Sequence, residues 1–383
     1  MATQKQLEAL RLWRVAEGKA ATKDGPKPTR RQVEQAQIRF AESIAYGDLP
    51  TQLLPSLRRT LVQRFEETPR AWSRFARRMT VEGIDVDEKV EVYAFNQDNL
   101  DDQQKMGDGF VPGGLPSIGR QAPYPQIGLE GTEKTIRAGK VGEAFGIEWE
   151  AIVNTRGRRV NLVRDALEAF GRHAANTEDI RLAQKLVKSS GFATASGEGL
   201  NGATALSGNP DLYDPEDIAT VIGTLLNTQV EGQLVPYSRF AILTSTANAP
   251  YIRRAVNARN MVRNPGATSG LSWSEQIDFG AEIEVIGWKW LSSIWSGIGK
   301  GAIIVPIPDE DELPVLTVNL LEGYETPSLW IKDSNARQVG GGEVNPEVDG
   351  DFDSDAVMTK VRHVVGASSL WNAAIGYTTG ANA

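Results

Sequence analysis

The sequence predicts an α+β protein, and three observations lead to this prediction. The first 80 residues show helical periodicity, with narrow apolar stripes and arginine-rich opposite faces. Two strand-like segments then flank a long stretch rich in Gly and Pro. One long amphipathic segment follows, and beyond it short strands and helices alternate before the chain ends in further strands.

Three helices are expected in the front of the chain, over residues 29–47, 53–67 and 68–79. In the first two, apolar residues recur at a spacing near 3.6. The third begins with Thr68 in an N-cap position and Pro69 in the first turn. Short helices of this kind are marginal in water, so they are expected to need a partner surface.

An extended two-stranded arm is expected next. Residues 88–96 alternate apolar and polar side chains as a strand does. A second strand is expected near residues 133–154, with Phe145, Ile147 and Trp149 on one face. The intervening stretch, 97–131, is long and shows neither helical nor strand periodicity. A lone hairpin is marginal in water, so this arm must lie on something.

The longest predicted helix covers residues 160–190, because Val163, Leu167, Phe170 and Ala174 recur on one face. Beyond it, strands and helices alternate in a compact α/β lobe. The segments expected to form this lobe are a helix near 214–229, a strand near 238–245, a helix near 248–258, and strands near 281–287 and 301–307. Terminal strands are expected near 314–321, 327–333, 358–365 and 370–376.

Composition excludes several classes of protein. The chain has 383 residues and no Cys, which excludes disulfides, thiolate nucleophiles and cysteine-ligated metals. No apolar run is long enough for a membrane helix, and the N-terminus lacks a signal-peptide core. We therefore expect a protein that is made in a cytoplasm and remains there.

The net charge of −8 is unevenly distributed. Residues 1–80 hold 16 Lys and Arg against 8 Asp and Glu, whereas residues 301–383 hold 4 against 13. This asymmetry is compatible with two unrelated solvated faces, with complementary surfaces between copies, or with a basic arm that faces a polyanion.

Apparent chemical motifs do not support catalysis. The glycines of residues 197–202 lie in a Ser/Ala/Thr-rich loop rather than between a strand and a helix, and residues 297–302 lack a Ser or Thr after Lys300. The acidic run at residues 349–355 lacks the Gly and Glu of an EF-hand. His173 and His363 are both expected to be core residues. We expect no enzyme activity, no catalytic residues, no metal and no cofactor.

The nine tryptophans are more informative, because this residue type buries a large area at contact surfaces. A place in the chain's own core is the simpler interpretation for most of them.

Three stretches together resemble the major capsid (major head) proteins of tailed bacteriophages, which have the Hong Kong 97-type fold. They are residues 122–154, residues 239–258 and residues 319–380, the last containing EGYETPSLWIKD and KVRHVVG. The resemblance covers about residues 70–380. It implies an N-terminal arm, an extended loop, a spine helix within a peripheral domain, and an axial domain.

On this resemblance the chain divides into four parts. A helical, basic arm would cover residues 1–88 and the extended loop residues 89–154. The peripheral domain would combine residues 155–209 and 308–383, with the spine helix at 160–190. The axial domain would cover residues 210–307.

The resemblance also implies function and partners. The chain would self-assemble through pentamers and hexamers into an icosahedral head shell that encloses double-stranded DNA, in the virion of a tailed phage or prophage. Portal protein, scaffolding or decoration proteins and packaged DNA would be partners, assembly would take place in the host cytoplasm, and no membrane would be involved. The candidate contacts between subunits are Phe110, Tyr124, Ile136, Arg137, Lys140, Phe145 and Trp149.

Three alternatives stay open from the sequence. The basic first 80 residues could bind nucleic acid, with Arg30, Arg31, Arg58 and Arg59 as the candidate DNA-facing residues. A related non-viral shell protein would show the same pattern. A hydrolase using paired carboxylates is a third possibility, although no pair is selected by the sequence.

Overall fold

The structure is a computed structural model, and it describes most of the chain in segments. The described residues are 54–96, 128–148, 159–194, 199–200, 202–230, 233–234, 237–258, 260–263, 273–276, 278–309, 314–332 and 356–380, together with residues 15, 28 and 32. They form two compact units. The first unit combines residues 1–69, 140–177 and 323–364, and the second combines 70–139, 178–322 and 365–383.

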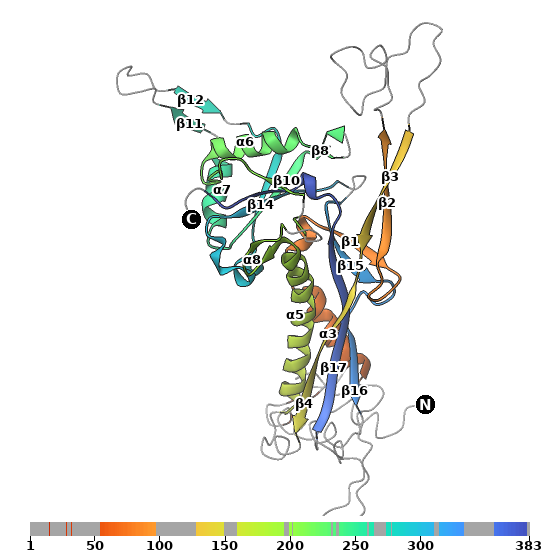
Figure 1. Ribbon diagram of the computed structural model, residues 1–383. Helices are drawn as coiled ribbons and strands as arrows, with labels where there is room; N and C mark the ends of the chain where they lie inside the picture. The colour runs from red at the N-terminus through yellow and green to blue at the C-terminus, as the bar shows by residue number, and fades with distance from the viewer. Residues whose placement is uncertain are drawn as a thin grey trace, which may run out of the picture. The chain divides into compact units, whose positions relative to one another are not determined.

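Two helices and three strands make up most of the described part of the first unit (Figure 1). Helix α3 (Leu54–Glu67) packs on the long helix α5 (Arg159–Leu186), where Phe65 contacts Ala174 and Ala175. The backbone of α3 comes so close that a side chain at Gly171 would lie 2.7 Å from the Leu61 carbonyl oxygen. Glycine is therefore needed at this crossing.

Helix α5 confirms the prediction of one long amphipathic helix. The expected apolar positions Leu167, Phe170 and Ala174 are buried, and so are Leu182 and Leu186 near its end. Its 28 residues correspond to about 42 Å at 1.5 Å per residue. The helix ends at Leu186 rather than Ser190, because Val187–Lys188 forms the short strand β5, which pairs with β6 (Gly191–Phe192).

The strands of the first unit are β4 (Gly139–Glu148), β16 (Ser328–Lys332) and the first part of β17 (Ala356–Ser369). Strand β17 lies between the other two, and β16 pairs with it in antiparallel register. The backbone of β4 approaches β17 closely, since a Cβ at Gly142 would lie 2.5 Å from the Val361 carbonyl oxygen. The predicted strand at 358–365 is confirmed and is longer than expected.

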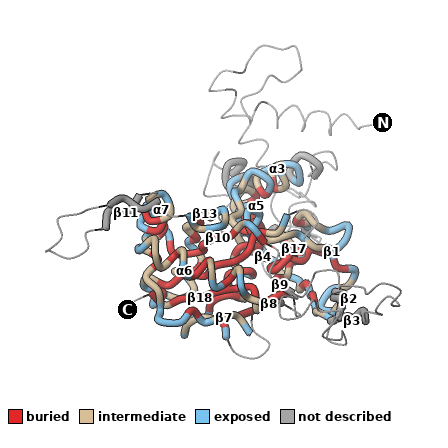
Figure 2. Tube along the Cα trace, turned by 90° about the horizontal axis from the view of Figure 1, so that it is seen from above, coloured by how far each residue is buried: buried red, intermediate tan, exposed pale blue. Residues whose placement is uncertain are grey.

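The second unit contains the predicted α/β lobe. Its sheet has the order β13–β10–β14–β18–β7, and nearly every residue of its central strands is buried (Figure 2). Its strands are β7 (Thr204–Ala205), β10 (Arg239–Thr244), β13 (Glu282–Gly287), β14 (Ala302–Pro306) and β18 (Gly376–Thr378). Strand β18 was expected in the peripheral domain, but it pairs with β14 and β7 here.

Helices α6 (Pro215–Leu226), α7 (Ala249–Asn257) and α8 (Lys289–Ile294) belong to this lobe. Helix α6 begins as its sequence requires: the Asp214 carboxylate accepts a hydrogen bond from the Glu216 N–H at 3.0 Å, with Pro215 in the first turn. Its buried face consists of Ile218, Val221, Ile222 and Leu225. Small strand pairs complete the lobe: β8 (Gln229–Val230) with β9 (Gln233–Leu234), and β11 (Asn260–Arg263) with β12 (Trp273–Gln276).

The prediction of a helix over residues 68–79 was wrong, because part of this segment belongs to a second group of strands in this unit. Only Trp72–Arg74 forms a helical turn, of the 3-10 type, and Arg77–Val81 is strand β1. Strand β1 pairs in parallel with β15 (Leu316–Leu321), and β15 pairs with the end of β17. Thr68 and Pro69 are typical of a helix start, but residues 77–81 pair with the distant strand β15 and are therefore extended. Local sequence does not indicate a partner that is so far away in the chain.

The two-stranded arm is present, but its second strand was wrongly predicted. Strand β2 (Glu88–Asn96) pairs with β3 (Gly128–Ile136) through nine residue pairs, from Glu88 opposite Ile136 to Asn96 opposite Gly128. Phe145 lies instead in β4, which is a strand of the sheet around β17. The change occurs at Arg137 and Ala138, two residues that separate β3 from β4.

Candidate assembly surfaces

The hairpin of β2 and β3 belongs to the second unit. Among the described residues no third strand pairs with it. Along its length the Lys89 ammonium contacts the Glu133 carboxylate, and this hydrogen bond raises the pKa of Lys89. A two-stranded ribbon of this kind has little stability of its own, so its surface is a candidate for contact with another molecule.

The predicted contact residues occupy different environments. Ile136 is only 3% exposed, so it belongs to the core of its own unit and is withdrawn as a candidate contact. Arg137 is exposed, but its guanidinium lies 3.4 Å from the Asp85 carboxylate and 3.9 Å from that of Asp87. Lys140 is exposed and Phe145 half-buried. Phe110, Tyr124 and Trp149 lie outside the described residues.

The predicted DNA-facing arginines are only partly described. Arg58 and Arg59 lie on α3 and are both exposed. Arg30 and Arg31 fall outside the part of the chain that the structure describes.

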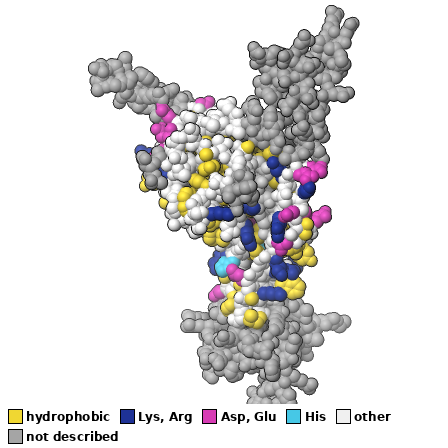
Figure 3. All heavy atoms as spheres, viewed as in Figure 1, with side chains coloured by type: hydrophobic (Ala, Val, Ile, Leu, Met, Phe, Trp, Pro, Cys, Tyr) yellow, Lys and Arg dark blue, Asp and Glu magenta, His cyan; other side chains and the backbone are white. Residues whose placement is uncertain are grey.

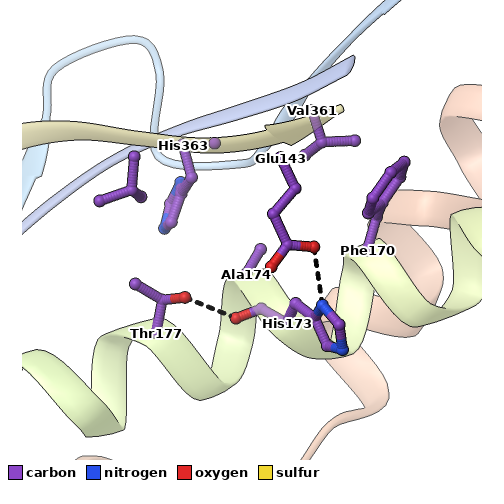
Figure 4. A pocket seen from close by; sticks show the side chains of 9 residues that line it. Glu143, Phe170, His173, Ala174, Thr177, Val361 and His363 are labelled. Atoms are coloured by element: carbon purple, nitrogen blue, oxygen red, sulfur yellow. Dashed lines mark hydrogen bonds and ion pairs between the residues drawn. The ribbon is translucent and has the colours of Figure 1, made fainter. Parts of the chain in front are cut away.

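Both histidines of the chain line one small pocket of the first unit, of about 120 Å³ (Figure 4). His363 projects from β17 and is buried, with its ring edge-to-face against Phe65 at 5.4 Å, which agrees with the prediction of a core residue. His173 was wrongly predicted: it is exposed, and its Nδ1 lies 2.8 Å from the Glu143 carboxylate of β4. The next residue, Ala174, belongs to the buried face of α5 instead.

The pocket offers no arrangement typical of catalysis. Apart from the histidines and Glu143 its lining is Val, Gly, Phe, Ala and Thr. Within the described ranges no group of three or more His, Cys, Asp or Glu side chains could hold a metal ion. Of the two histidines that line the pocket, His363 belongs to the core and His173 lies on the surface.

Two adjacent carboxylates of α5 hold the segment that follows α3. The Asp179 carboxylate accepts hydrogen bonds from the backbone N–H groups of Ala71 and Trp72, at 3.2 and 3.0 Å. The buried Glu178 carboxylate accepts one from the Trp72 indole at 2.9 Å and lies 3.5 Å from the Arg70 Nε. Burial raises the pKa of Asp179 above its ordinary value. No local sequence pattern predicts this contact, because it joins residues more than 100 positions apart.

Lys300, from the glycine-rich stretch at 297–302, is held by its own lobe. Its ammonium lies 2.6 Å from the Asp211 carboxylate and 4.9 Å from the centre of the Tyr213 ring. The hydrogen bond to Asp211 raises the pKa of Lys300, and burial raises the pKa of Tyr213. This lysine therefore stabilises the lobe as an ion-pair and cation–π partner.

The tryptophans are divided between core and surface. Trp72, Trp288 and Trp371 are buried, as the simpler interpretation predicted. Trp330 is 48% exposed on β16 and is flanked by the cations of Lys360 and Arg362. None of the helices in the described part of the chain is both long enough and apolar enough to cross a membrane.

Comparison with known families identifies the class of protein. A family described as phage capsid protein matches residues 131–374, which is more than half of the chain. The chain therefore belongs to the phage capsid protein family. Its α+β fold, with an extended hairpin, one long helix and a separate α/β lobe, is the Hong Kong 97-type capsid fold that the sequence resemblance implied.

Solved structures similar to this chain come from several particles. The virus-like particle from Pyrococcus furiosus shares 10% identity at a TM-score of 0.43, covering 86% of this chain and 100% of that one. Gordonia phage Cozz shares 14% identity at 0.41, with 80% and 85% covered. The capsid of cyanophage P-SCSP1u shares 10% identity at 0.42, with 82% and 89% covered. A search of curated proteins finds no match.

Membership of this family establishes the function at the level of class. The protein is a phage capsid protein, a structural subunit of the virion shell. The family match favours this function over two of the alternatives that the sequence left open, a nucleic-acid-binding protein and a non-viral compartment protein.

Proposed function

We propose that copies of this capsid protein assemble with one another, through pentamers and hexamers, into the closed icosahedral head shell that encloses packaged double-stranded DNA. The observation that carries the proposal is the hairpin of β2 and β3, which pairs nine residues of each strand with no third strand among the described residues. Such a ribbon gains stability when it lies on a neighbouring subunit. Its role is structural rather than catalytic.

The proposed parts follow the predicted domains with two adjustments. The extended loop is the segment from Glu88 to Ile136, since these residues bound the paired strands. The N-terminal arm ends before Arg77, where strand β1 begins. Helix α5 serves as the spine helix of the peripheral domain, and the lobe around β10 serves as the axial domain. Arg137, Lys140 and Phe145 stay candidate contacts between subunits, as do Phe110, Tyr124 and Trp149.

Packaged DNA is the proposed partner of the basic front of the chain. Arg58 and Arg59 are exposed on α3, and Arg30 and Arg31 extend the same basic segment along the sequence. Contacts of this kind are independent of DNA sequence and weaken steeply with salt. A portal protein, and scaffolding or decoration proteins, complete the proposed partners, and assembly takes place in the cytoplasm of the bacterial host.

The proposal is tested by expressing the chain alone. Closed particles of uniform diameter in negative-stain micrographs are expected, whereas a monomer at all concentrations in sedimentation velocity would contradict self-assembly. A variant that lacks Phe110–Gly128 shortens the connection between β2 and β3 and removes the first residue of β3, and it should remain a folded, soluble monomer. Normal particles from this variant would contradict the role given to the extended loop.

The DNA contact is tested separately. Arg58→Gln combined with Arg59→Gln should lower non-specific DNA binding and reduce the slope of log affinity against log salt by about 1–2, because up to two phosphate contacts are removed. Unchanged DNA affinity and slope would remove α3 from the DNA-facing surface, without affecting the proposal of self-assembly.

A further inference from the structure

Four of the six large hydrophobic side chains that are exposed in the described residues fall in two charged settings of opposite sign; the other two are Tyr251 and Tyr324. Ile84 and Val86 lie among carboxylates in the second unit, and Trp330 and Met358 lie beside cations in the first. Exposed apolar groups that cluster rather than scatter commonly mark an interaction site. Hydrophobic and charged side chains are seen together on the surface in Figure 3.

The first setting is the turn between β1 and β2, residues 82–88, which we name the acidic turn. Ile84 is 43% exposed and Val86 53% exposed. Glu82, Asp85 and Asp87 are exposed beside them. The turn therefore presents two apolar side chains among three carboxylates, and one cation, Arg137, lies 3.4 Å from Asp85 and 3.9 Å from Asp87.

The backbone of the acidic turn is held in a defined shape. The Glu88 carboxylate accepts hydrogen bonds from the N–H groups of Glu82 and Gly83, at 2.6 and 2.7 Å. The Asp85 N–H donates to the Ala138 carbonyl at 2.8 Å. Asp85 has φ = 57°, in the left-handed region that is uncommon for residues other than Gly. A turn constrained in this way loses little conformational entropy when it binds.

The second setting is a face of β16 and β17 that we name the cationic patch, formed by Trp330, Met358, Lys360 and Arg362. Trp330 and Lys360 are directly opposite each other in the strand register. The Lys360 ammonium lies 5.6 Å from the centre of the Trp330 ring and the Arg362 guanidinium carbon 5.1 Å. Met358, 37% exposed, precedes Lys360 on the same face, because strand side chains alternate.

We propose that the acidic turn of one copy docks on the cationic patch of a second copy, so that Ile84 and Val86 meet Trp330 and Met358 while Asp85 and Asp87 meet Lys360 and Arg362. This inference rests on the proposed self-assembly and names one of its contacts. The two surfaces are complementary in apolar contact and in charge, since each presents two apolar side chains and the charges around them are opposite. The acidic turn and the cationic patch are different surfaces of the chain, so the contact between two copies is head-to-tail. Contacts of this kind build rings and closed shells.

A second copy fits the cationic patch better than nucleic acid does. The patch offers two cations beside two apolar side chains, whereas non-specific DNA binding relies on many phosphate contacts. The complementary acidic and apolar surface is present on the same chain. Binding of DNA to the cationic patch is therefore the competing result that the test must distinguish.

The absence of cysteine in the chain permits a direct test by cross-linking. In the double variant Val86→Cys, Met358→Cys, a short bismaleimide should link assembled subunits into a ladder of multimers on denaturing gels. Each single variant should give no ladder beyond a dimer. The control variant Val86→Cys, Tyr251→Cys places the second cysteine at an exposed site of α7 and should give no ladder.

The outcomes separate this contact from the proposed function. Particles that form but give no ladder would overturn the contact and leave self-assembly intact. A cross-linked monomer of altered mobility would mean that the two residues meet within one chain, which would also overturn it. Failure of the unchanged chain to form particles would instead contradict the proposed function.

Charge reversal gives an independent readout. Asp87→Lys and Lys360→Glu should each raise the subunit concentration needed for half-maximal assembly several-fold, and the two together should restore much of the loss. The double variant has the same net charge as the unchanged chain, so restoration reports the pairing rather than total charge. Equal losses without restoration would overturn the proposal. Lys360→Glu that lowers DNA binding but leaves assembly unchanged would assign the patch to nucleic acid and overturn it as well.

Discussion

At the scale of single residues, Gly366 of β17 allows the two residues between β3 and β4, Arg137 and Ala138, to approach this strand. A Cβ at this position would lie 1.9 Å from the Arg137 carbonyl oxygen and 2.9 Å from the Ala138 Cα. Both neighbours are backbone atoms, which cannot rotate away as the end of a side chain can. The position therefore requires glycine although its sequence context, within the strand β17, disfavours glycine.

Gly366→Ala should destabilise the protein by about 1–3 kcal/mol, since the added methyl group forces the backbone apart. Its matched control is Gly223→Ala in α6, where an added Cβ meets no atom within 4 Å. The control should be neutral or stabilising by up to about 1 kcal/mol, because alanine favours the helix. Urea denaturation measures both, and equal stability of the two variants would contradict the steric argument.

The buried carboxylate of Asp179 makes stability depend on pH in a defined direction. Burial is the largest cause of its raised pKa, and the hydrogen bonds from Trp72 and Ala71 oppose it. Because the folded protein binds this proton more tightly than the unfolded chain does, the contribution is fully present below the ordinary carboxyl pKa. It is lost as the pH rises through the raised value of the folded state.

Asp179→Asn should therefore flatten the dependence of unfolding free energy on pH between the ordinary carboxyl pKa and the raised one. The amide oxygen still accepts from a backbone N–H, whereas Asp179→Ala leaves both N–H groups without this acceptor and should cost about 1–3 kcal/mol. Urea denaturation at a series of pH values measures both effects. An unchanged pH profile for Asp179→Asn would show that this carboxyl does not titrate differently on folding.

At the scale of elements, α3 depends on α5 for its stability. Helix α3 is short and rich in arginine, and its buried residues Leu61 and Phe65 face α5 near Gly171. Isolated helices of this length are marginal in water, so packing rather than propensity maintains it. The close approach at Gly171 and the ring of Phe65 together specify where the helix lies.

Phe65→Ala should release α3 before the rest of the first unit unfolds. The loss of a buried phenylalanine costs about 3–5 kcal/mol, which exceeds the stability of a short helix. Under native conditions trypsin should then cleave faster at Arg58, Arg59 and Arg64. Val62→Ala, on the half-buried side of the same helix, is the control and should leave cleavage almost unchanged. Equal cleavage of the two variants would contradict the packing argument.

At the scale of the whole molecule, burial is uneven. The strands of the lobe, such as β10, are buried almost throughout, whereas the hairpin of β2 and β3 pairs with no third strand in the described part of the chain. If the hairpin lies on neighbouring subunits as proposed, we expect it to be more stable in the shell than in the isolated subunit.

Hydrogen exchange should therefore separate the hairpin from the lobe. Backbone amides of β2 and β3 should exchange rapidly in the dissociated subunit and at least about tenfold more slowly in particles, because local opening sets the rate. Amides of β10 should be protected in both states and serve as the internal control. Equal protection of the hairpin in the subunit and the particle would contradict its assignment as an assembly element.

Much of the fold could be predicted from the sequence where the signal is local. The apolar stripe of α5, the capped start of α6 at Asp214 and Pro215, and the apolar runs of β10 and β14 all specify their own elements. Of the candidate site, the buried state of His363 followed from the alternation of side chains along its strand. The acidic turn could not be predicted, because its shape depends on a hydrogen bond to Ala138, more than 50 residues away.

The sequence by itself determined the class of fold, the long helix, the lobe and the resemblance to a capsid protein, because periodicity and the order of motifs are properties of the chain. Only the tertiary structure decided that β3 rather than β4 pairs with β2, that Arg77–Val81 is a strand, and that His173 is exposed. These features depend on ladders and contacts between distant segments. Local side-chain patterns indicate whether a segment is a strand or a helix. The segment against which it packs depends on which backbones can approach each other, and the missing side chain of Gly366 permits such an approach at Arg137.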